Sequence, residues 1–136
     1  MYALGRVFNV VHEASGVHIP LTNAGAITYV TFVAAGTNTA TVKESVNGAS
    51  EQALDVTMYP FKGPGVGGTW TAMAEQDDTL TNNDATNDCM VFTIQADTLS
   101  EGFNCVEVTM DAGTCIAIIH DLLSQRNPAN LPSSVV

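Results

Sequence analysis

The feature that most constrains this chain is a series of short segments rich in β-branched and aromatic residues, separated by turn residues at intervals of roughly eight to twelve residues. This spacing is typical of an all-β sandwich or barrel, because each segment is long enough for one strand and each break supplies a turn. At 136 residues the chain fits one domain with its own core. We predict one antiparallel β-sandwich with Greek-key connections, Ig-like or jelly-roll, over residues 1–124.

Three segments in the first half carry the clearest strand patterns. Residues 26–33 are apolar on both faces, as expected for a central strand. Residues 39–46 and 52–59 flank Asn47-Gly48, a pair that favours the positive φ angles of a type I′ turn and so predicts a hairpin. The buried face of the second strand of this hairpin is predicted to carry Leu54, Val56 and Met58.

The last third of the chain predicts two half-buried strands joined by a corner. Residues 90–95 and residues 105–110 both alternate apolar with more polar side chains. Between them, residues 97–103 place a leucine three residues before a glycine that an aromatic follows. Similar segments cross between the sheets of Greek-key sandwiches.

The most apolar stretch near the C-terminus covers residues 114–120, whose three isoleucines favour a strand, although residues 116–123 also fit a short helix. A tight turn at residues 111–113 precedes this stretch. We expect the two strands that flank the turn to form a hairpin. In that register Cys105 and Cys115 do not face each other.

Two segments in the middle of the chain predict loops. Residues 63–68 are GPGVGG and lack the Gly-Lys-Ser/Thr ending of a phosphate-binding loop, so a plain flexible loop is favoured. A short strand over residues 69–74 follows and carries Trp70. Residues 77–88 are rich in Asp, Asn and Thr, and their carboxylates could recruit calcium, but their spacing does not match an EF-hand. A solvated loop is favoured there.

The charge of the chain limits its partners. Four basic residues against fourteen acidic ones give a net charge of −10, which repels nucleic-acid phosphates and anionic membranes. No apolar stretch approaches the ~20 residues of a membrane span, and the N-terminus lacks the pattern of a signal peptide. We therefore predict a cytoplasmic product that binds neither nucleic acid nor membrane. Charged residues are only 13% of the chain, about half the usual share, which suits a surface covered by neighbouring subunits.

The histidines do not predict a metal or catalytic site. His12, His18 and His120 lack the close ligand spacing of a zinc site, so we expect surface or cross-strand histidines. His12-Glu13 and His120-Asp121 each place a base beside a carboxylate in the sequence. Because adjacent strand residues point to opposite faces, neither pair is expected to meet.

The three cysteines, Cys89, Cys105 and Cys115, are too few and too odd in number for a disulfide framework, and no pair has C-x-x-C spacing. We expect free thiols in the core, where burial suppresses the reactive thiolate. No G-x-S-x-G nucleophile turn is present. The sequence therefore predicts a protein that is not an enzyme, with no cofactor and no metal.

Residues 125–136 form a tail with two prolines, one charge and little apolar content. Such a tail can fray as a free terminus, or it can lie as an extended arm across a neighbouring subunit, where prolines reduce the entropy lost on ordering. Composition alone leaves both readings open. The contacts of the arm would come from Arg126, Asn127, Pro128, Asn130, Leu131 and Pro132.

Several short motifs resemble small head-region virion proteins of tailed bacteriophages. They are IIHDL at 118–122 with QRNPANLP at 125–132, GVHIPL at 16–21 running into AI at 26–27, and the corner at 96–102 with Val106 and Val108. The resemblance implies a non-enzymatic structural subunit that decorates or cements a capsid on the virion surface, after synthesis in the bacterial cytoplasm. Its partners would be the major capsid protein and copies of itself, with a homotrimer as the natural guess, although the sequence equally allows a pentamer or a hexamer. The resemblance also favours the arm over the frayed end.

Two other functions fit the same composition. A carbohydrate-binding sandwich that serves host adhesion would need exposed aromatic platforms, for which the candidates are Trp70, Tyr59 and Tyr2. A tail-tube subunit would have a similar β-rich composition and would assemble into rings.

Overall fold

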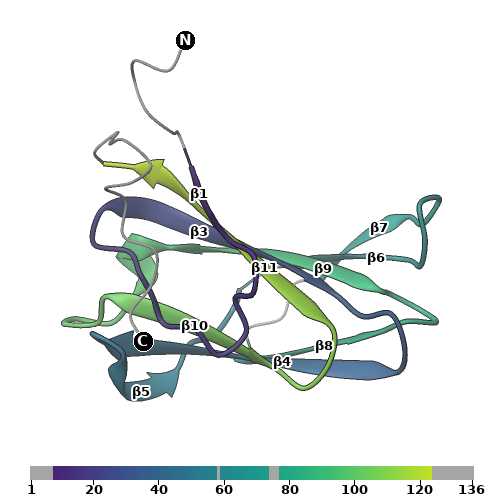
Figure 1. Cartoon of the computed structure of the whole chain (residues 1–136), viewed down its shortest axis with the longest axis horizontal. Helices are drawn as coiled ribbons and strands as arrows, with labels where there is room; N and C mark the ends of the chain where they lie inside the picture. Colours follow the sequence, from purple (N-terminus) through teal and green to yellow (C-terminus); the bar gives the residue numbers. More distant parts are fainter. Residues whose placement is uncertain (1–7, 58, 74–76, 124–136) are drawn as a thin grey trace, which may run out of the picture.

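Two antiparallel β-sheets pack face to face in the computed structural model, which describes residues 8–57, 59–73 and 77–123 (Figure 1). The six-stranded sheet is called sheet A, and the other sheet is called sheet B. The predicted all-β sandwich is confirmed. The only helical segment of the described residues is a 3-10 turn, η1 (Ala96–Thr98), and no described helix is long and apolar enough to cross a membrane.

Sheet A has the strand order β1-β11-β3-β9-β6-β7. Its strands are β1 (Asn9–Val11), β11 (Thr114–Leu122), β3 (Ala24–Phe32), β9 (Cys89–Gln95), β6 (Tyr59–Lys62) and β7 (Trp70–Met73). Strand β3 lies between β11 and β9, so the prediction of a central strand in this region is confirmed. The isoleucine-rich stretch near the C-terminus is a strand, and the alternative of a short helix is wrong.

Sheet B has the order β2-β10-β4-β5, and β8 also pairs with β4. Its strands are β2 (Ile19–Pro20), β10 (Cys105–Met110), β4 (Thr37–Val46), β5 (Ala49–Ala53) and β8 (Thr79–Asn83). Strand β4 is long enough to pair with β8 over its first half and with β5 over its second half. The predicted turn at Asn47-Gly48 is confirmed, since these residues have the positive φ angles, 52° and 79°, of a type I′ turn and join β4 to β5. The predicted bounds of the second strand, residues 52–59, are wrong: β5 ends at Ala53, and Leu54 and Val56 are buried beyond its end.

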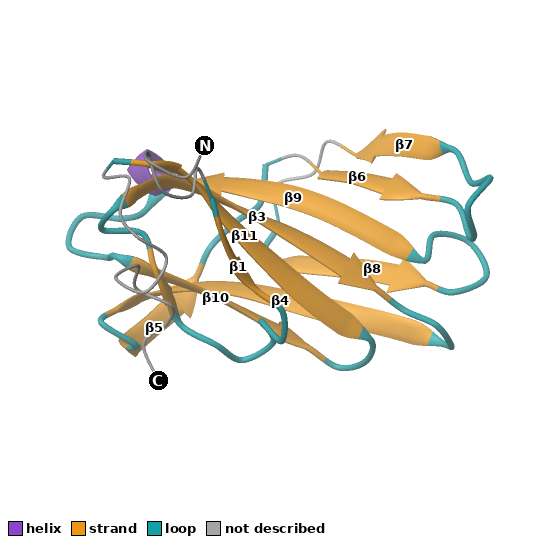
Figure 2. Cartoon of the chain, turned by 45° about the horizontal axis from the view of Figure 1, so that its top comes forward, coloured by secondary structure: helices purple, strands orange, loops and turns teal. Residues whose placement is uncertain are grey.

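The corner between β9 and β10 carries the chain from sheet A to sheet B, as predicted (Figure 2). A buried carboxylate anchors it. Glu44 of β4 is 1% exposed, and its oxygens accept hydrogen bonds from the backbone N–H of Ser100, at 2.8 Å, and from the side-chain amide of Gln52. Because a buried carboxylate must be fully hydrogen-bonded, this contact fixes the path of the corner.

The expected hairpin between the last two strands is wrong. Strand β10 pairs with β2 and β4 in sheet B, whereas β11 pairs with β1 and β3 in sheet A, so the turn at residues 111–113 crosses the sandwich. Gly113 permits the crossing, because its φ is 87° and a Cβ at this position would collide with the carbonyl of Phe32. A tight turn in the sequence does not say whether its two strands share a sheet.

Residues 77–88, expected to be a solvated loop, contain β8. Leu80 and Asn82 of this strand are buried, at 0% and 1% exposure. The side-chain amide of Asn38 donates a hydrogen bond to Asn82 Oδ1 at 2.9 Å, so the two buried polar side chains satisfy each other. The inward asparagine conceals the alternation by which a strand is normally recognised.

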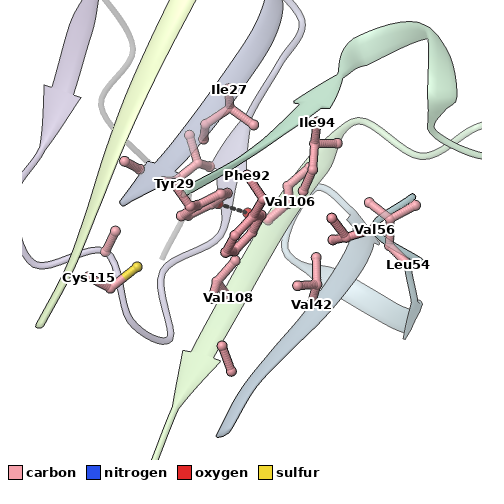
Figure 3. Packing of buried hydrophobic residues seen from close by; sticks show 14 of the residues in the cluster. Ile27, Tyr29, Val42, Leu54, Val56, Phe92, Ile94, Val106, Val108 and Cys115 are labelled. Carbon is pink, nitrogen blue, oxygen red and sulfur yellow. Dashed lines mark hydrogen bonds between the residues drawn. The ribbon is translucent and has the colours of Figure 1, made fainter. Parts of the chain in front are cut away.

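The core between the sheets is centred on Tyr29 of β3 and Phe92 of β9, whose rings stack with centroids 5.4 Å apart (Figure 3). Val42, Val106 and Val108 of sheet B are fully buried in the same cluster. The predicted inward faces of three segments are confirmed by the burial of Leu54, Val56, Met90, Phe92, Ile94, Val106 and Val108. Met58, the remaining member of the predicted hairpin face, lies outside the described residues.

The outward side of β10 is a further correction. The alternation places Cys105 and Glu107 on this side and predicts an exposed Glu107, but both residues are buried, at 0% and 8% exposure, and only the burial of Cys105 was expected. The neighbouring strands and the imidazole of His18 cover them, so β10 is buried on both faces along most of its length. The alternation within one strand cannot predict whether other segments of the chain will cover its outward-facing side chains.

We expect Val108→Asp to unfold the domain, because it places an unpaired charge between the sheets at a site with no exposed surface. The cost should reach about 4 kcal/mol or more, a large part of the stability of a domain of this size. Thr81→Asp is the matched control, since it adds the same charge at an exposed strand position. Thermal melting followed by circular dichroism is the measurement, and an unchanged melt of Val108→Asp would contradict the face assignment.

Candidate functional site

The outer face of sheet A carries apolar side chains on neighbouring strands. Most solvated sheet faces alternate polar residues outward. Here the strand pairing sets Val10 opposite Ile118 and sets Val30 between Ile116 and Val91, and all of these side chains are exposed or half-buried. We call the following set the apolar face: Val10, Val30, Phe32, Val66, Trp70, Val91, Ile116 and Ile118.

A recess of about 420 Å³ lies at the β6–β7 end of the apolar face. One cross-strand row, Phe32–Cys89–Lys62–Trp70, runs through it over four strands. Phe32 is 45% exposed and Trp70 is 49% exposed, while Val66 in the loop between β6 and β7 is fully exposed. Large apolar side chains in this arrangement favour burial against a partner.

The polar groups at the rim of the recess already have partners. The ammonium of Lys62 donates to the carbonyls of Gly63 and Gly65, and a carboxylate oxygen of Asp88 accepts the N–H of Gly65 at 2.9 Å. These contacts tether the predicted loop over residues 63–68. A sugar needs free donors and acceptors for its hydroxyls, so the recess suits an apolar partner better than a glycan.

The residues predicted to act as contact sites have different outcomes. Trp70 is exposed and lines the recess, as a binding platform requires. Tyr59 is 4% exposed and packs edge-on against Phe61, so the prediction that it offers an exposed platform is wrong. Tyr2 and the six arm residues, Arg126, Asn127, Pro128, Asn130, Leu131 and Pro132, lie outside the described residues.

A second cluster lies on the outer face of sheet B. The imidazole Nε2 of His18 lies 3.3 Å from Glu51 Oε1 and 3.9 Å from Glu107 Oε2. These three ligand atoms all lie within 4.8 Å of one another. No local pattern predicts this cluster, because its members come from three segments far apart in the chain, although His18 is a cross-strand histidine as expected.

His120 and Asp121 do meet, contrary to the expectation from adjacency. Asp121 has a φ of 53°, which interrupts the alternation of β11 and lets Oδ2 approach His120 Nδ1 to 3.0 Å. The Nε2 atom of His120 lies 2.9 Å from the hydroxyl of Thr28. The order carboxylate, imidazole and hydroxyl is that of a hydrolase triad.

This arrangement is better explained as a structural network. Thr28 lies in the middle of β3, whose backbone N–H groups are committed to pairing with β9 and β11, so no donors are left there for an oxyanion. The hydroxyl of Thr28 is also hydrogen-bonded to Thr93 at 2.8 Å. The chain of contacts ties the three central strands of sheet A together.

Cys89, Cys105 and Cys115 are free and buried, as predicted. Cys105 and Cys115 belong to different sheets, so they do not pair. Burial raises the pKa of each thiol above its usual range, to about 12 for Cys115. Such thiols are poor nucleophiles at neutral pH.

Comparison of the chain with protein-family models, curated proteins and solved structures finds no significant match. Function must therefore be inferred from the geometry of the chain itself.

The native protein is expected to react slowly with a thiol reagent at pH 8, because all three sulfurs are buried and their raised pKa values keep them protonated. Under denaturing, non-reducing conditions the same titration should count three thiols. A count of one would reveal a disulfide and would contradict the separation of the cysteines.

Proposed function

We propose that this protein is a non-enzymatic structural subunit that associates with copies of itself and with a larger protein shell through the apolar face. The single observation that carries the proposal is the exposure of Phe32, Val66 and Trp70 around one apolar recess. Soluble monomers rarely leave large apolar side chains grouped in this way, because covering them is favourable by about 25 cal/mol per Å². The shell we propose is a tailed-phage capsid, which rests on the sequence resemblance.

The chemistry of the rest of the surface supports an assembly role. The His120 imidazole contacts Thr28 and Asp121, and the Glu44 carboxylate accepts the N–H of Ser100, so both groups serve structural contacts. The low share of charged residues leaves an outer surface that neighbouring subunits can cover at a small desolvation cost. Many weak contacts of this kind add up when copies are held on one particle.

Glycan binding is the second candidate function, and the exposed indole of Trp70 favours it. The engaged polar rim of the recess argues against it, because Lys62 and Asp88 are already bonded to the loop. A tail-tube subunit would use the same apolar face between neighbours in a ring. The number of subunits in the assembly distinguishes a tube from a decoration protein.

The double variant Phe32→Ser/Trp70→Ser should weaken self-association and binding to capsid shells by at least tenfold, or about 1.4 kcal/mol, because it removes both exposed aromatics of the apolar face. Leu123→Ser is the matched control, since it removes an apolar side chain that is 75% exposed and lies outside the apolar face. Analytical ultracentrifugation and co-sedimentation with shells are the measurements. Unchanged association of the double variant would sink the proposal, and glycan-array binding that Trp70→Ser abolishes would support the second candidate.

Deletion of residues 127–136 tests the proposed arm separately. The sandwich core is built from residues that precede this segment, so the melting temperature of the truncated monomer should barely change. If the tail is an arm, shell binding should fall by at least tenfold. Full binding by the truncated protein would leave the frayed terminus as the better description.

A further inference from the structure

The cluster of His18, Glu51 and Glu107 lies on the sheet opposite the apolar face. His18 immediately precedes β2, Glu51 lies in β5 and Glu107 lies in β10, so one small volume joins three elements of sheet B. Side chains of this kind are common metal ligands, but proximity of acidic groups alone does not make a site. The burial and the hydrogen bonds of each ligand atom decide whether the cluster is a metal site.

One carboxylate oxygen in the cluster is buried without a hydrogen bond. Glu107 is 8% exposed, and its Oε2 atom has almost no exposed surface and no hydrogen bond within the protein. A buried carboxylate oxygen without a hydrogen bond costs more free energy than a buried neutral polar group without one. This atom is one of the three that face one another, which indicates that a cation completes its coordination.

The other polar atom of each ligand is held by a neighbouring side chain. His18 Nδ1 lies 3.1 Å from Ser45 Oγ, and Thr109 Oγ1 donates to Glu107 Oε1 at 3.3 Å. Lys43 Nζ donates to Glu51 Oε2 at 2.7 Å. Outer contacts of this type orient metal ligands, and here the contact with Ser45 uses Nδ1, so that Nε2 is the ring atom that faces the two carboxylates.

The spacing fits a small divalent ion. Ligand atoms about 2.0–2.1 Å from a tetrahedral zinc are about 3.3–3.4 Å apart. The separation of His18 Nε2 from Glu51 Oε1 is 3.3 Å, and that from Glu107 Oε2 is 3.9 Å. One ligand atom from each of the three residues lies within 4.8 Å of the other two, so small movements of the glutamate side chains bring all three to a common ion. An imidazole ligand favours zinc-like transition ions over calcium or magnesium, which prefer oxygen alone.

We propose that His18, Glu51 and Glu107 bind one zinc-class divalent cation, with water or a partner's side chain in the fourth position. The ion would connect the two-residue strand β2 and the edge strand β5 to β10. Its positive charge would add to that of the Lys43 ammonium and offset the negative charges of the two carboxylates. Bound only by the folded state, it stabilises the sandwich in proportion to its free concentration. This site does not depend on the assembly function proposed above.

The full-length protein, stripped with EDTA and dialysed, is titrated with ZnCl₂ by calorimetry and with CoCl₂ by visible absorption. We expect one ion per chain, a cobalt spectrum typical of tetrahedral coordination, and a higher melting temperature with zinc. His18→Gln and Glu107→Gln should each weaken binding by at least tenfold. His120→Gln is the matched control, because it removes another partly buried histidine outside the cluster and should bind as the unaltered chain does.

Circular dichroism of the metal-free variants separates loss of a ligand from loss of the fold. If Glu107→Gln does not fold, His18→Gln and the ¹⁵N shift of the His18 ring on zinc addition decide the question. The proposal is overturned if the unaltered chain binds no zinc, or if folded His18→Gln and Glu107→Gln bind as tightly as the His120→Gln control. In that outcome the direct contacts of His18 with Glu51 and Glu107 account for the cluster.

Discussion

The contact on which the sandwich depends is the burial of Tyr29 between the two sheets. Its ring stacks on Phe92 within sheet A, and its hydroxyl donates to the carbonyl of Val106 in sheet B at 3.5 Å. Burial raises the pKa of this tyrosine well above its usual range, so the hydroxyl remains a neutral donor. At this length the hydrogen bond is weak, and most of the stabilisation comes from apolar area removed from water. The bond avoids the cost of an unpaired buried hydroxyl, and so it fixes how the sheets face each other.

This packing closes the inner face of sheet A and leaves its outer face to be covered by something else. Strand β3 carries apolar side chains on both faces, and Val91 of β9 lies beside its outer face, so the pattern that marks β3 as central also creates the exposed set around Phe32 and Trp70. Part of the outer face of sheet B is covered by the chain itself, because the segment before β2 and the strand β5 cover Glu107. The same arrangement brings three potential metal ligands together. The two faces therefore suit different partners, a protein surface on one and a cation on the other.

Alternation and turn chemistry predict the sandwich, the central strand, the Asn47-Gly48 hairpin and the corner after β9, because these features depend on residues close in the sequence. The predictions that are wrong concern features that depend on contacts between segments far apart in the sequence. Gly113 could turn a hairpin or cross between sheets, and only the close approach to Phe32 selects the crossing. Asn82 points inward because Asn38 meets it, which no local pattern reveals. The positive φ of Asp121 brings it beside His120, and the cluster at His18 needs three strands in register.

We propose that sheet A has one face closed by the core and one face closed by assembly. Hydroxyl-radical footprinting of the free protein and of the assembled particle tests it at single residues. Phe32 and Trp70 should be oxidised in the free protein and protected in the particle, while Tyr29 and Phe92 should be protected in both. Equal oxidation of Phe32 and Trp70 in the two states would contradict the claim, because the apolar face would then remain in contact with water after assembly.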